Sequence, residues 1–168
     1  MQKSVTKGAL PTVVVGEFYA TGDRITQGYI LNSATESLNV VGSVVTQVAA
    51  KFNEVGVAAS AVFAGIICSS KSLAKEGLAT QATIENGTPV EVAKSGFLGV
   101  KLPAAAAIGD YVYYSDTTGV LATKARNVAP PAAHTRLPGG TVEYFNIAGE
   151  GAAVIYFNFA GDTTVGSA

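Results

Sequence analysis

The fold class of this chain follows from residues 108–122, Ile108-Gly-Asp-Tyr-Val-Tyr-Tyr-Ser-Asp-Thr-Thr-Gly-Val-Leu-Ala122. Residues 111–114 are aromatic and β-branched, which suits a half-buried pleated strand. Asp116-Thr-Thr-Gly119 is typical of a turn, and Val120 begins the return strand. The stretch therefore predicts a β-hairpin, and it holds no paired catalytic groups.

Further strand-like segments lie on both sides of this hairpin and are separated by turn signals. They are Thr12–Val15, Tyr29–Leu31, Leu38–Thr46 with a bend at Gly42, Ala61–Cys68, Ala82–Glu85, Pro89–Ala93, Gly96–Leu102, Thr141–Ile147 and Ala152–Phe159. Ala61–Cys68 is continuously apolar, which is typical of a central strand that is buried on both faces. Asn86-Gly87 predicts a tight hairpin turn. This succession predicts an all-β protein, either an antiparallel β-sandwich or a small β-barrel with long loops.

Four regions interrupt the strand pattern. We expect residues 1–10 to form an extended N-terminal arm and residues 161–168 a flexible C-terminal tail, on either side of a single β domain over residues 11–160. Residues 47–60 predict an irregular excursion with at most a helical turn, because Gly56 would end a helix. Residues 69–76 predict a polar loop. Residues 123–140, which are rich in proline and glycine, predict a long loop.

The composition is unusually apolar for a solitary soluble domain. Charged residues make up 14% of the 168, hydrophobic residues 48%, and the mean hydropathy is +0.34. An ordinary domain carries about 25% charged residues. We infer that copies of this chain or a partner cover part of its surface. Abundant alanine and valine are the alternative explanation of the high mean hydropathy.

Charge and targeting signals exclude several classes of partner. The formal net charge is -1 and the basic residues are scattered, so we expect no nucleic-acid partner. No stretch reaches the roughly 18 apolar residues of a membrane span, so we expect no membrane partner. The first seven residues lack the apolar centre of a signal peptide, and the single Cys68 predicts no intramolecular disulfide. We expect a soluble protein that is made and used without export.

Candidate catalytic groups are sparse. His134 is the only histidine, and it lacks a nearby Ser, Cys or Asp, which favours a surface or interface role over that of a general base. Glu85 and Glu91 could face each other across the Asn86-Gly87 turn as an acid–base pair, although like charges on a solvated hairpin are more common. No zinc, calcium, phosphate or dinucleotide motif is present. We expect no enzyme activity, no cofactor and no metal.

Seven segments, taken in order, resemble the structural cement, or capsid decoration, proteins of tailed bacteriophages. They are Phe63–Ile67, Asn86–Val92, Gly96–Val100, Gly109–Tyr114, Thr118–Leu121, Leu137–Val142 and Gly151–Tyr156. The resemblance covers residues 29–158 and implies an all-β protein that binds the outside of the assembled head and bridges neighbouring major capsid protein subunits. The chain departs from the family pattern at Lys51–Ser60 and at Val44–Gln47, which leaves the details of the interface open.

The resemblance also sets expectations for partners and contacts. It implies synthesis in the host cytoplasm, a place on the outer capsid surface of the virion, the major capsid protein as partner, and a homo-oligomer, either a dimer or a trimer. Candidate capsid or self-contacts are Lys3, Lys7, Leu10, Phe52, Val55, Tyr113, His134 and Arg136. If the strand alternation holds, Tyr111 and Tyr113 point one way, and Val112 and Tyr114 the other.

Two other functions stay open at this point. A β-structured carbohydrate-binding or adhesin module would show exposed aromatic rings that stack on sugars, although the chain has no tryptophan. An enzyme with a sparse carboxylate site would use Glu85 with Glu91.

Overall fold

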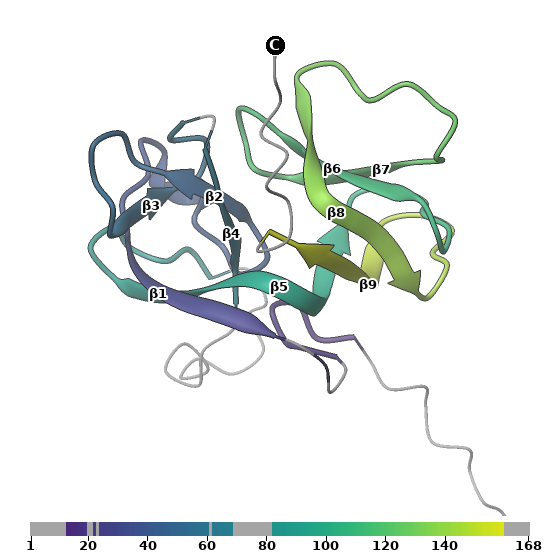
Figure 1. The fold of residues 1–168 in the computed structure, drawn as a ribbon, viewed down its shortest axis with the longest axis horizontal. Coiled ribbons are helices and arrows are strands. Elements are labelled where there is room, and N and C mark those ends of the chain that lie inside the picture. The colour runs from purple at the N-terminus through teal and green to yellow at the C-terminus, as the bar shows by residue number, and fades with distance from the viewer. Residues whose placement is uncertain (1–12, 20–21, 23, 61, 69–81, 160–168) are drawn as a thin grey trace, which may run out of the picture.

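The computed structural model describes residues 13–19, 22, 24–60, 62–68 and 82–159 (Figure 1). Within these ranges the chain is all-β, as predicted, apart from one short 3-10 helix, η1 (Glu36–Leu38). The strands are β1 (Ile25–Leu31), β2 (Val44–Gln47), β3 (Glu54–Gly56), β4 (Phe63–Ile67), β5 (Pro89–Leu102), β6 (Tyr111–Ser115), β7 (Leu121–Lys124), β8 (His134–Tyr144) and β9 (Gly151–Asn158). None of the described helices is long and apolar enough to cross a membrane.

A small barrel forms one side of the molecule. The strand order β1-β3-β2-β4-β5 closes on itself because β1 also pairs with the first part of β5. All of these pairings are antiparallel except that of β1 with β3. The barrel encloses its own apolar core, which includes Leu31, Val45, Val55, Ile67 and Val92.

A second sheet continues from the far half of β5 in the order β5-β9-β8-β6-β7 (Figure 1). Its inner face supplies Leu98, Val142 and Ile155 to a second core, which Val44 and Ile66 of the barrel also enter. Successive residues of a strand point to opposite faces, so Val44 and Ile66 serve this core while Val45 and Ile67 serve the barrel. The prediction that Ala61–Cys68 contains a strand buried on both faces is confirmed by β4.

Two predicted strand pairs are present in the structure. In the β6–β7 hairpin Tyr114 lies opposite Leu121, and in the β8–β9 pair Thr141 lies opposite Tyr156. Both pairs join segments that are close in the sequence, with aromatic and β-branched residues on either side of a turn.

The prediction of a loop over residues 123–140 is wrong at both ends, because β7 extends to Lys124 and β8 begins at His134. The β6–β8 register shifts here: Tyr113 lies opposite Arg136, and Tyr111 lies opposite Thr141. Residues 137–140 therefore form an irregular stretch of the strand. Proline and glycine are tolerated at such places because the hydrogen-bond ladder is already interrupted there.

Other segments also differ from their predictions. Val15 and Gly16 form a turn, residues 38–41 form the end of η1 and a turn, and residues 82–85 are not a strand. The excursion over residues 47–60 contains β3, which forms because it pairs with β1 and β2. Residues 89–93 and 96–102 are parts of one strand, β5. The predicted arm over residues 1–10, the loop over residues 69–76 and the tail over residues 161–168 lie outside the described residues.

The Asn86-Gly87 turn is present, but it does not close a hairpin. The Asn86 side chain accepts a hydrogen bond from the Ser33 backbone N–H and donates one to the Ser33 carbonyl, both at 2.9 Å. The Gly87 N–H donates to the Leu31 carbonyl at 2.7 Å. The turn is therefore fastened to the end of β1, a contact between segments far apart in the sequence.

The segment from Val13 to Tyr19 runs beside β5. The Gly16 N–H donates to the Gly99 carbonyl at 2.8 Å, and the Tyr19 N–H donates to the Phe97 carbonyl at 2.9 Å. A side chain at Gly99 would overlap the carbonyl oxygen of Val14, so glycine is needed at this position for close approach. This contact places Tyr19 beside the second sheet.

Candidate interaction surfaces

Exposed apolar side chains are the most distinctive surface feature of the described part of the chain. The same part holds no group of three or more His, Cys, Asp or Glu side chains that could bind a metal ion. Among the described residues, Phe52 is the most exposed large hydrophobic side chain, with 84% of its surface accessible. It lies in the loop between β2 and β3. With Val48, Ala49 and Val62 it lines a shallow, mainly apolar hollow of about 450 Å³.

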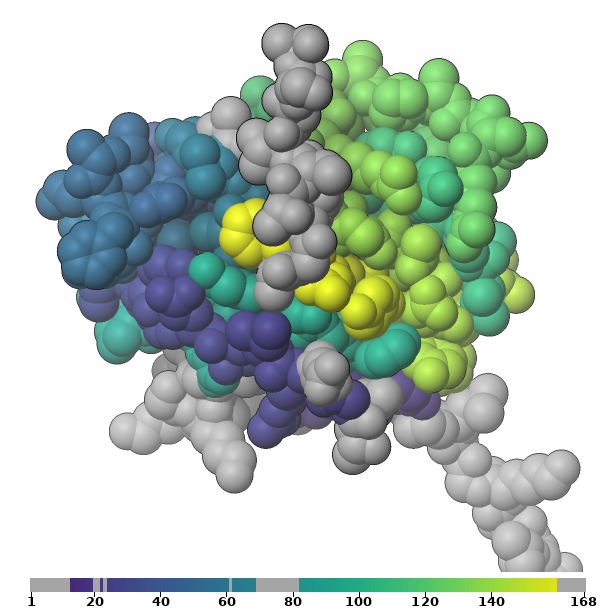
Figure 2. Space-filling view, in the orientation of Figure 1, coloured from purple at the N-terminus to yellow at the C-terminus, as the bar shows by residue number. Residues whose placement is uncertain are grey.

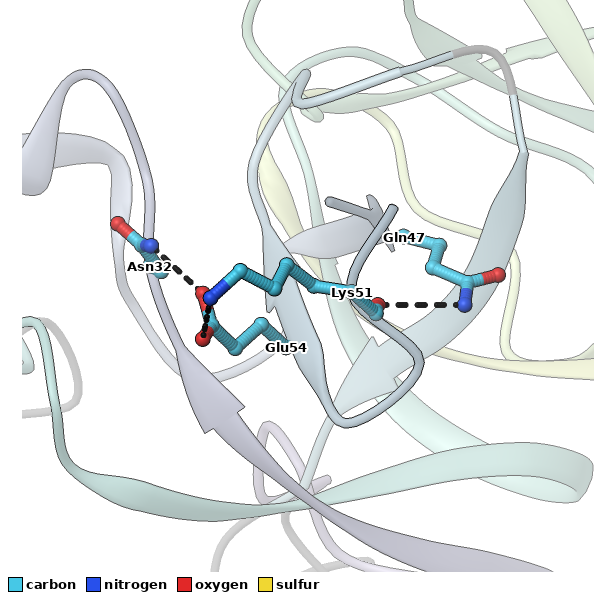
Figure 3. A network of polar contacts seen from close by, with 4 residues as sticks. All are labelled: Asn32, Gln47, Lys51 and Glu54. Atoms are coloured by element: carbon cyan, nitrogen blue, oxygen red, sulfur yellow. Dashed lines mark hydrogen bonds and ion pairs between the residues drawn. The ribbon is translucent and has the colours of Figure 1, made fainter. Parts of the chain in front are cut away.

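Polar contacts brace this loop (Figure 3). Lys51 Nζ lies 3.2 Å from Glu54 Oε1, and Asn32 Nδ2 donates to Glu54 Oε2 at 2.8 Å. Gln47 Nε2 donates to the Lys51 carbonyl at 3.3 Å. The hydrogen bonds from Asn32 and Lys51 lower the pKa of Glu54, so its carboxylate stays charged and keeps both donors. Phe52 is therefore displayed on a braced loop, which reduces the entropy lost when a partner covers it.

The other candidate residue of this region has a different environment. Val55 is fully buried and lies beside Leu31 in the β1–β3 pairing. Its side chain contributes to the barrel core, although it is only three positions from Phe52. Val62, in contrast, is 55% exposed and lines the hollow with Phe52, yet it was not predicted. In the sequence Val62 belongs to an apolar run that continues into β4, so nothing local separates it from the core.

The candidates of the second sheet differ in exposure. Arg136 is exposed on β8, and its guanidinium carbon lies 3.7 Å from the centre of the Tyr111 ring. His134 is half-buried at the start of β8, with Nδ1 2.7 Å from the Ala132 carbonyl oxygen. Tyr113 is only 6% exposed. Lys3, Lys7 and Leu10 lie outside the described residues. The role of all eight candidate residues in contacts with the capsid or with other copies of the chain stays a prediction.

A second hollow, of about 350 Å³, lies at the seam between the barrel and the second sheet. Val44 and Thr46 of β2 line one side, and Tyr114, Asp116 and Thr135 line the other. Thr135 donates to Asp116 at 2.7 Å, and burial raises the pKa of Tyr114 above its usual value. The seam holds neutral hydroxyl groups and one carboxylate that already has a donor, which suits structural contacts better than proton transfer.

Fold and surface together define an all-β protein whose described part exposes several large apolar side chains. The chain matches the family model of the structural cement protein (E217 gp24/Pam3 gp6) over residues 1–158. It therefore belongs to the structural cement protein family, as the resemblance implied, and has a structural role in the phage capsid, which places it in the virion.

A solved structure shares the fold. One chain of the capsid of Myoviridae phage XM1 superposes with a TM-score of 0.57 at 16% sequence identity, covering 90% of this chain and 95% of that chain. No curated protein matches the sequence.

Proposed function

We propose that this protein binds the outer surface of the assembled head and stabilises contacts between major capsid protein subunits. The observation that carries the proposal is Phe52, a nearly fully exposed aromatic side chain on a braced loop beside an apolar hollow. Exposed aromatic residues that fill a partner's pocket are typical binding hot spots. Burying one large apolar side chain contributes about 1.5–3 kcal/mol.

Binding of this kind would stabilise the shell by mass action. A protein that binds only the assembled lattice shifts the equilibrium away from disassembly, and the effect grows as its concentration exceeds the dissociation constant. Self-association into a dimer or trimer, which we also propose, would add avidity because the shell repeats its binding sites. We propose the arm over residues 1–10 and the loops over residues 47–60 and 123–140 as the main contact regions.

Phe52→Ala tests the proposal. We expect the variant to bind undecorated capsids roughly 10-fold or more weakly than the wild type, since an exposed anchor is lost without a core being disturbed. Val120→Ala is the matched control, because Val120 is also an exposed apolar residue, at 47%, but lies at the β6–β7 turn. Occupancy on purified heads, measured against protein concentration, gives both affinities.

The same capsids give a second readout. The wild-type protein should raise the temperature at which the heads lose their contents, and Phe52→Ala should raise it less at equal concentration. The proposal would be contradicted if the wild-type protein neither binds heads nor stabilises them. Equal binding of Phe52→Ala and wild type would remove Phe52 from it.

The arm and the oligomer need separate measurements. Deletion of residues 1–10 should reduce occupancy on heads if the arm makes shell contacts. Sedimentation of the free protein should give the mass of a dimer or a trimer. A monomer at the concentrations used for capsid binding would contradict the oligomer part of the proposal.

A further inference from the structure

The outer face of the second sheet carries one row of side chains across all five of its strands. Register places Lys124 of β7 beside Tyr111 of β6, Tyr111 beside Thr141 of β8, Thr141 beside Tyr156 of β9, and Tyr156 beside Phe97 of β5. Their neighbours along the strands, Val112, Val142, Ile155 and Leu98, all belong to the second core. The row therefore points away from that core.

Aromatic rings extend this row. Phe97 lies 4.9 Å from Tyr156 and 5.8 Å from Tyr144, ring centre to ring centre, and Tyr144 lies 5.5 Å from Tyr19. Tyr144 is 41% exposed, and Tyr19, Phe97 and Tyr156 are half-buried. Neither core includes any of these rings. We call the group Tyr19, Phe97, Tyr111, Tyr144, Tyr156 and Arg136 the outer-face belt.

Two arginines give the belt a cationic end. Besides Arg136, Arg126 has its guanidinium carbon 5.4 Å from the Tyr111 ring centre, and its Nε donates to the Gly109 carbonyl at 3.0 Å. Within the described residues no carboxylate lies within 4.0 Å of either guanidinium. Three acidic residues close to them in the sequence already accept hydrogen bonds: Asp110 from the Ala107 N–H, Asp116 from the Thr135 hydroxyl and Glu143 from the Thr141 hydroxyl.

The arrangement of these groups indicates the chemistry of the occupant. A guanidinium that stacks on a ring keeps in-plane N–H donors free, and these match the two oxygens of a carboxylate. Tyrosine, phenylalanine and arginine together are the residue types enriched at protein–protein hot spots. A sugar platform needs a free flat ring face, whereas these rings pack against one another at 42–46°. The three cations beside Tyr111, namely Lys124, Arg126 and Arg136, form a small patch for nucleic acid, whose binding needs a longer basic face.

We propose that the outer-face belt is a second shell-docking surface, which takes a protein segment of the capsid that carries carboxylate and apolar side chains. The inference rests on the proposed function. A molecule that bridges two subunits through separate contacts needs two binding surfaces. Phe52 lies in the barrel, and the belt lies on the second sheet. In Figure 2 the β2–β3 part of the barrel (blue) and the β6–β8 part of the second sheet (green) lie on opposite sides of the molecule. Two such contacts to neighbouring subunits act with avidity.

Charge reversal at Arg136 tests the belt. Arg136 is exposed and its replacement removes one surface cation–π contact with Tyr111, so Arg136→Glu should lower the melting temperature of the free protein only slightly while weakening binding to heads roughly 10-fold or more. Lys101→Glu is the matched control: it makes the same charge change on an exposed residue of β5 whose ion-pair partner, Glu150, is also exposed. Wild-type affinity should fall as salt is added, and the fall should be shallower for Arg136→Ala.

Each outcome of the test has a defined meaning. The belt inference alone would be overturned if the wild-type protein binds heads, Phe52→Ala binds them weakly and Arg136→Glu binds them as well as the wild type does. Failure of the wild type to bind heads would overturn both proposals. A changed sedimentation mass of Arg136→Glu with unchanged occupancy would assign the belt to a second copy of this chain. Glycan-array binding by the wild type that Tyr144→Ala abolishes would assign it to a sugar, and either assignment overturns the inference.

Discussion

Cys68, the single thiol of the chain, shows how the interior suppresses the chemistry of a reactive group. It is 2% exposed, follows β4 and packs in the second core with Ile66. Burial raises the pKa of its thiol to about 12, and the negative charge of Glu91 contributes in the same direction. A thiol with so high a pKa forms almost no thiolate near neutral pH, and the thiolate is the reactive species.

The native protein should therefore resist thiol reagents. We expect labelling by a disulfide reagent at pH 8 to be slow in buffer and complete within minutes in denaturant. The pKa of the Cys68 thiol is higher in the folded than in the unfolded protein. Its contribution to the free energy of unfolding is therefore complete below the unfolded pKa of about 8.5 and declines as pH rises toward 12. Fast labelling of the native protein would show that the second core opens readily.

Single residues also separate surface from core over very short distances. Phe52 and Val55 are three positions apart, yet one is 84% exposed and the other is fully buried. The β2–β3 loop ends between them, and β3 enters the barrel between β1 and β2. The hydrophobicity of these two residues therefore says little about their roles until the pairing of β3 is known.

The turn of the β6–β7 hairpin is the clearest case of an element that local sequence predicts and tertiary contacts complete. Gly119 has φ +65, and its carbonyl accepts from the Val44 N–H at 3.2 Å. A Cβ at Gly119 would meet the Val44 carbonyl oxygen at 2.6 Å. The hairpin tip is thus docked on β2 and joins the second sheet to the barrel.

Gly119→Ala should lower the free energy of unfolding by about 1–3 kcal/mol, because alanine is strained at this φ and crowds Val44. Gly28→Ala is the control, since a Cβ there has no atom within 4 Å, and we expect it to be nearly neutral. Urea denaturation followed by circular dichroism gives both values. A loss below about 0.5 kcal/mol for Gly119→Ala would mean that the tip moves freely from β2.

The whole molecule is organised around β5. This strand pairs with β1 and β4 in its first half and with β9 in its second half. Val92 lies in the barrel core and Leu98 in the second core, only six positions along the same strand. The two cores therefore share backbone, and neither sheet keeps all of its hydrogen bonds if the other unfolds.

We expect a single cooperative unfolding transition as a result. Leu31→Ala in the barrel core and Ile155→Ala in the second core should each cost about 2–5 kcal/mol and should each shift the same transition. Calorimetry and circular dichroism should give coincident midpoints for both variants. Two transitions, with each variant lowering only one, would show that the cores unfold independently.

Patterns over a few neighbouring residues were enough to predict the all-β class, the β6–β7 hairpin, the β8–β9 pair and the buried β4, because in each case the alternation and the turn lie within one short stretch. The ordered motifs were also enough to indicate the cement family. Only the tertiary structure decided that the barrel closes through β1 and β5, that β8 continues across Pro138, and that Val55 is core while Phe52 is surface. It also brought Phe97, Tyr111 and Tyr156 into one row. Each of these depends on register between strands far apart in the chain, which local propensity does not specify.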